Sequence, residues 1–143
     1  MFNYSPKIKA LSVLIIIIVI IGVILLVRYN NSRSRDLELF SQAKILAIAL
    51  ERYYDKFYSY PESTVIDVTS IRMITDQGLN QEGNIIYFMQ SFEWAAPASY
   101  TSNGTDYSIE FNLNNSWPVW NLEGRGGGLC RLTRNINIKC IEP

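Results

Sequence analysis

Residues 36–61, DLELFSQAKILAIALERYYDKFYSYP, carry the pattern that decides the fold. Apolar side chains recur at steps of four, three, four, three and four residues, which lines them along one face of an α-helix. Acidic groups early and basic groups late suit the helix dipole. Pro61 and the restricted residue before it end the helix. The predicted buried face, which we expect to pack on a sheet, comprises Leu39, Ala43, Leu46, Leu50, Tyr53 and Phe57.

The opposite side of this helix also carries apolar residues, Leu37, Ile45 and Ile48, among charged neighbours. A helix that packs against a single sheet does not need them. They either contact loops of the same domain or bury against another subunit. We therefore treat these three residues as a candidate subunit contact.

Rings crowd the end of the stretch, because five of the eight residues from Tyr53 to Tyr60 are aromatic. Such a cluster is either a ligand-binding surface or the packed end of the helix. Tyr53 and Phe57 continue the apolar face, and the alternating Tyr107, Ile109 and Phe111 offer a strand to pack on. The pattern favours a joint between helix and sheet.

Residues 10–27, ALSVLIIIIVIIGVILLV, contain no charge. Eighteen helical residues extend about 27 Å, close to the thickness of a bilayer's hydrocarbon core. A cleavable signal peptide usually has a shorter apolar region and ends in small residues, whereas this stretch runs into Arg28. The sequence predicts one uncleaved anchor in the lipid bilayer, with a lipid-facing series at Leu11, Leu14, Ile18, Ile21 and Leu25.

The two cysteines, Cys130 and Cys140, bear on the orientation of the anchor, because basic residues flank it on both sides and do not decide its direction. Two short strands around a turn at 134–135 would bring the two thiols together, as disulfide geometry requires. A disulfide persists in an oxidising compartment, and the alternative is two unpaired thiols in a cytosolic domain. We favour a disulfide, with the amino terminus inside and the C-terminal domain extracytoplasmic.

The composition argues against several function classes. The formal charge is zero and the chain contains no His, the commonest general base and metal ligand. No basic face suggests nucleic-acid binding. We therefore expect no enzymatic activity, no cofactor, no metal and no small-molecule ligand. Trp117 and Trp120 form a candidate binding loop for sugar or peptide, although two such rings more often cap the edge of a core.

The C-terminal half predicts an antiparallel sheet of three or four strands. Residues 65–78 have the spacing of a short helix or helical turn, and residues 84–94 fit a strand or a buried helix. Asn103-Gly104 between alternating runs is a strong hairpin signal, and residues 129–140 suggest a final hairpin. The order of one long helix followed by strands indicates an α+β fold.

The chain is predicted to have four parts. Residues 1–9 form a short cytoplasmic N-terminus, and residues 10–27 form the transmembrane helix. Residues 28–35 are either a polar linker or a continuation of the helix. Residues 36–143 form the extracytoplasmic domain.

These features together resemble type IV pilins and the pseudopilins of type II secretion. The match rests on the apolar N-terminal helix, on ALERYY with the YSYP helix exit, on YTSNGTDYSIEFNL and on GGGLCRLTRNINIKC. The resemblance implies a long helix packed on a small sheet. It also implies a structural subunit whose N-terminal helix bundles with those of other pilin-like subunits, in a pilus or pseudopilus-like filament at the cell surface.

One departure from the family motivates an alternative. Family members carry a basic leader that ends in Gly before the apolar helix, and a Glu soon after the cleavage point. Here Gly22 is the first glycine and Asp36 the first acidic residue. The alternative is a single-pass membrane protein that does not assemble and has a pilin-like extracellular binding or sensing domain.

Overall fold

The computed structural model describes residues 6–83, 86–88, 93–114 and 128–141. The chain divides into two units, Met1–Ser34 and Arg35–Pro143. The second unit contains the strands and the C-terminal part of the one long helix. Its helix and antiparallel strands make an α+β fold, as the sequence predicts.

Helix α1 runs from Pro6 to Phe57. Residues 28–35 are part of it, so of the two alternatives for this stretch the structure contains the helix continuation. The helix ends because Tyr58 adopts a φ of 57°, while its N–H still donates to the carbonyl of Tyr54 at 2.7 Å. A left-handed residue directly after the last turn is a common helix end, and Pro61 prevents the helix from resuming.

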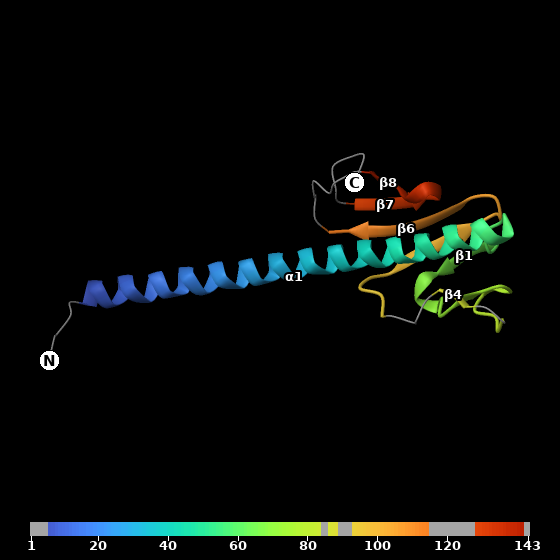
Figure 1. The fold of residues 1–143 in the computed structure, drawn as a ribbon. Coiled ribbons are helices and arrows are strands. Elements are labelled where there is room, and N and C mark those ends of the chain that lie inside the picture. Colours follow the sequence, from blue (N-terminus) through green and yellow to red (C-terminus); the bar gives the residue numbers. More distant parts are fainter. Residues whose placement is uncertain (1–5, 84–85, 89–92, 115–127, 142–143) are drawn as a thin grey trace. The chain divides into compact units, whose positions relative to one another are not determined.

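A five-stranded antiparallel sheet packs on the second unit's part of α1, in the order β1-β5-β6-β7-β8 (Figure 1). The sequence prediction of three or four strands missed β1, the edge strand that pairs with β5. The five strands are β1 Ser63–Asp67, β5 Ala98–Ser102, β6 Tyr107–Leu113, β7 Gly128–Thr133 and β8 Asn137–Ile141.

Two tight turns set the register of this sheet, as the sequence indicated. Residues 103–106, which begin with Asn103 and Gly104, join β5 to β6, with Gly104 at a φ of 84°. The 3-10 turn η2, Arg134–Ile136, joins β7 to β8. Asn135 and Ile136 both have positive φ in this turn, a conformation that is unusual for a β-branched residue.

Residues 63–97 hold the main departure from the sequence prediction. Of the two alternatives for residues 65–78, a short helix was wrong, and a helical turn is present only as the 3-10 turn η1 Val68–Ser70. The rest of the segment contains the end of β1, β2 Ile74–Thr75 and the start of β3 Gly78–Leu79. Seven of the eleven residues 65–75 are β-branched, and such side chains favour strands. Of the two alternatives for residues 84–94, the described part supports a strand, β4 Ile86–Phe88, which joins β2 and β3 in a small sheet.

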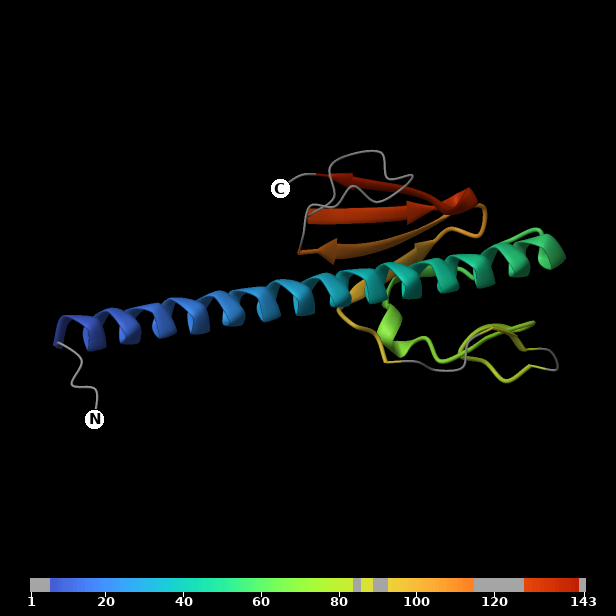
Figure 2. The ribbon, with the colours of Figure 1, turned by 60° about the vertical axis from the view of Figure 1, so that its left-hand side comes forward.

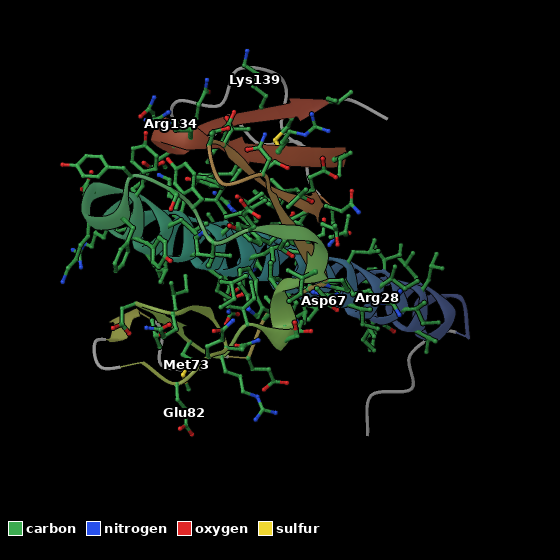
Figure 3. The ribbon with its side chains drawn as sticks, turned by 90° about the vertical axis from the view of Figure 1, so that its right-hand side faces the viewer. Arg28, Asp67, Met73, Glu82, Arg134 and Lys139 are labelled. Carbon is green, nitrogen blue, oxygen red and sulfur yellow. A yellow bond between two sulfur atoms is a disulfide. The ribbon has the colours of Figure 1, made fainter. Side chains whose placement is uncertain are left out.

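The core lies where α1 meets these layers. The five-stranded sheet lies on one side of α1 and the β2–β4 segment on the other (Figures 1 and 2). Seen along the helix, Arg134 and Lys139 lie on the sheet side, whereas Met73 and Glu82 lie on the opposite side (Figure 3). The helix contributes the following buried apolar residues: Leu39, Ala43, Leu46, Ala47, Ala49, Leu50 and Tyr53.

Candidate assembly surface

The N-terminal part of α1 is apolar on every side. An 18-residue window in it has a mean hydropathy of 3.2, and none of that window is buried within the structure. This is one helix long and apolar enough to cross a membrane. The series predicted to face lipid is between 51% and 61% exposed at Leu11, Leu14, Ile18, Ile21 and Leu25.

The second unit's part of α1 leaves one narrow face exposed. Leu37, Ile45 and Ile48 are 49%, 41% and 39% exposed, and Ser41 between them is also exposed. Steps of four, four and three residues keep these four side chains on one side of the helix. We call Leu37, Ser41, Ile45 and Ile48 the exposed stripe. The candidate subunit contact at Leu37, Ile45 and Ile48 stays a prediction.

The exposed stripe is narrow because both the five-stranded sheet and the chain before β5 contact α1. Gln42, which is buried, accepts a hydrogen bond from the N–H of Ala95 at 2.9 Å and donates to the carbonyl of Glu93 at 2.8 Å. Arg35 also donates to the carbonyl of Ala95, at 2.6 Å. These bonds attach the helix to the chain just before β5, on the flank that the five-stranded sheet does not cover. Sequence reasoning missed this role of Gln42, because nothing local marks its distant partners.

A carboxylate joins α1 to the sheet near the helix end. Glu51 accepts hydrogen bonds from the hydroxyl groups of Tyr60 at 3.1 Å and Tyr107 at 3.0 Å. It also accepts one from the N–H of Asn135 at 2.9 Å. Burial, and then the charge of Glu51, raise the pKa of both tyrosine hydroxyls above the ordinary value. We call Glu51 with these three donors the Glu51 joint; no local sequence signal marks it.

The aromatic cluster at the helix end shares Tyr60 with the Glu51 joint. Tyr53 is buried, and its ring centroid lies 4.6 Å from that of Phe57, which is half-buried at the edge of the core. Tyr60 stacks on Tyr54 at 4.7 Å and is itself buried. Tyr58, by contrast, points away and is 81% exposed. The cluster is therefore mostly packing between helix and sheet.

Cys130 and Cys140 face each other across the β7–β8 pair and form a disulfide. Both side chains are buried. Of the two alternatives for the cysteines, the structure therefore contains the disulfide, which links the two strands of the last hairpin.

A second buried carboxylate, Asp36, lies at the start of the second unit. It is 3% exposed and accepts hydrogen bonds from the backbone N–H of Asn114 at 3.1 Å. The contact ties the first turn of this part of α1 to the end of β6. Sequence reasoning counted Asp36 among the early acidic groups that suit the helix dipole and missed this contact.

Other surfaces of the described residues offer little for chemistry. Among them, no group of three His, Cys, Asp or Glu could hold a metal ion. One open groove of about 390 Å³ is lined mostly by hydroxyl side chains, including Ser63, Thr101 and Ser108. The candidate binding loop with Trp117 and Trp120 lies outside the described residues.

Comparisons with protein-family models, with curated proteins and with solved structures found no match.

Proposed function

We propose that this chain is a membrane-anchored, pilin-like structural subunit that assembles with other pilin-like subunits through α1. The observation that carries the proposal is the exposed stripe, whose apolar residues lie on the same helix as a segment long and apolar enough to cross a membrane. The sequence resemblance described above supports the same function. In this proposal the N-terminus lies inside, residues 36–143 lie outside the membrane, and the assembled form is a surface filament of the pilus or pseudopilus type.

The free energy gained by burying the exposed stripe is modest, so association between subunits would also depend on the membrane anchor. Full burial of a Leu or Ile side chain is worth about 1.5–3 kcal/mol. Because Leu37, Ile45 and Ile48 are already more than half covered, closing the stripe adds about 2–4 kcal/mol in total. Association in the membrane must therefore also draw on packing between the apolar segments.

The test replaces Ile45 and Ile48 by Gln in the full chain. A matched control replaces Val65 and Ile141 by Gln, because these two residues are also apolar and exposed but lie on strands β1 and β8. With a label on the chain, electron microscopy of surface appendages should show incorporation lost in the first variant and kept in the control. Normal filaments with both Ile45 and Ile48 changed would refute the proposed contact.

The alternative is a single-pass protein that stays in the membrane and binds or senses something outside. The positions of Gly22 and Asp36 favour it, since neither the usual Gly nor the usual Glu borders the apolar segment. The intact mass of the protein from its native membrane separates the two. A lost N-terminal leader would rule out the uncleaved form, whereas an unchanged N-terminus would rule out processing of the usual pilin kind.

A further inference from the structure

The turn between β5 and β6 contains a triplet of the kind that carries N-linked sugars, Asn103-Gly104-Thr105. Asn103 and Thr105 are both exposed. The carbonyl oxygen Oδ1 of Asn103 accepts three hydrogen bonds: from the N–H of Thr105 at 3.1 Å, from its hydroxyl at 2.9 Å and from the N–H of Asp106 at 2.8 Å. The side-chain amide is therefore held in one orientation.

This orientation leaves the nitrogen of the amide accessible. Every hydrogen bond of the Asn103 side chain among the described residues is made by Oδ1, and none by Nδ2. The backbone of the turn is also fixed, because Gly104 accepts a hydrogen bond from the N–H of Tyr60 at 2.7 Å. An exposed turn thus presents an amide nitrogen to solvent, with the hydroxyl of the triplet already on the amide oxygen.

Three other triplets of the same type begin at Asn3, Asn30 and Asn114, and the structure describes the asparagine in the last two. Asn30 lies inside helix α1, where side chains two positions apart do not face each other, so Ser32 cannot reach the amide in the same way. Asn114 donates its Nδ2 to the buried carboxylate of Asp36 at 3.3 Å. The structure therefore distinguishes the accessible amide of Asn103 from the amides of Asn30 and Asn114.

We propose that Asn103 is a site of N-glycosylation. The reaction joins Nδ2 to the anomeric carbon of a sugar carried by a lipid-linked phosphate donor. The bond between that carbon and the phosphate oxygen breaks, the lipid phosphate leaves with the electron pair, and one proton of Nδ2 passes to a base of the transferase. The inference rests on the placement of residues 36–143 outside the membrane, and it goes beyond assembly because the turn lies apart from the exposed stripe.

The test is mass spectrometry of the full chain purified from its own membranes. We expect the mass of a sugar chain on the peptide that contains Asn103, and none on Asn30 or Asn114. Asn103→Gln and Thr105→Val should remove it, whereas Thr105→Ser, which keeps the hydroxyl, and Asn114→Gln should retain it. Because Thr105 is exposed, Thr105→Val should fold even where Asn103→Gln disturbs the turn.

The same spectra distinguish a failure of this inference from a failure of the proposed topology. An unmodified Asn103 with the Cys130–Cys140 disulfide intact would overturn the inference and leave the extracytoplasmic placement standing. An unmodified Asn103 with both cysteines reduced would overturn both. Sugar on Asn30 or Asn114 instead of Asn103 would refute the structural selection between the triplets.

Discussion

The Glu51 joint makes a sharp prediction about the stability of the second unit. Glu51→Ala removes the acceptor of three hydrogen bonds, two of them from buried tyrosine hydroxyls. A hydrogen bond to a charged group contributes about 1.5–3 kcal/mol, and a buried donor left unsatisfied costs about 1–3 kcal/mol. Glu51 itself is only half-buried, so water compensates in part. We expect a loss of about 3 kcal/mol rather than the full sum.

The assay is urea unfolding of the full chain in detergent, followed by the fluorescence of the domain's aromatic residues. Asp55→Ala is the matched control, because Asp55 is an exposed carboxylate on the same helix and its loss should change stability by less than about 0.5 kcal/mol. Tyr107→Phe removes one donor. In that background Glu51→Ala should cost at least about 1 kcal/mol less than in the native chain. An equal cost in both backgrounds, or no cost in the native one, would refute the joint.

Three further predictions concern the same domain. Tyr53→Ala should cost about 3–5 kcal/mol, and Phe57→Ala distinctly less, because Tyr53 is buried and Phe57 lies at the edge of the core; equal losses in urea unfolding would contradict this. Reduction of the disulfide, which closes a loop of 10 residues, should cost about 2–3 kcal/mol, measured as a lower unfolding midpoint with dithiothreitol than without. Burial raises the pKa of Tyr100, and burial together with the charge of Glu51 raises that of Tyr107. The contribution of each tyrosine to the free energy of unfolding is therefore complete below about pH 10, the pKa in the unfolded chain. Above that pH it declines by up to about 1.4 kcal/mol per pH unit for each tyrosine. Unfolding midpoints between pH 8 and 11.5 should fall less steeply in Tyr107→Phe, and an unchanged slope would contradict the assignment.

The sequence predicted the helix and the hairpins well because their signals are local. The step pattern from Leu39 to Tyr53 depends only on helical geometry, and each residue of that face is buried. Asn103-Gly104 specifies its turn for the same kind of reason, since Gly accepts a positive φ without cost. Tight turns and amphipathic helices are determined by neighbours within a few positions.

The first strand and the polar contacts could not be predicted in this way. Val65, Val68 and Ile71 have the spacing of a helix, yet the pairing of β1 with β5 places Ser63 opposite Ser102, a partner far along the chain. Glu51 and Gln42 looked like ordinary polar residues of a helix surface. Their roles depend on tertiary partners, which overrule local preference.

The order of strands in the large sheet has a consequence for how the domain folds. Short turns join β5 to β6 and β7 to β8, so those pairings close small loops, whereas β1 must find β5 across the whole β2–β4 segment. Small loops close at lower entropic cost and faster. We expect β1 to join last among the strands present. The hairpin that carries both cysteines comes last in the strand order, so its covalent bond can form only after the other three strands of the sheet have been synthesised.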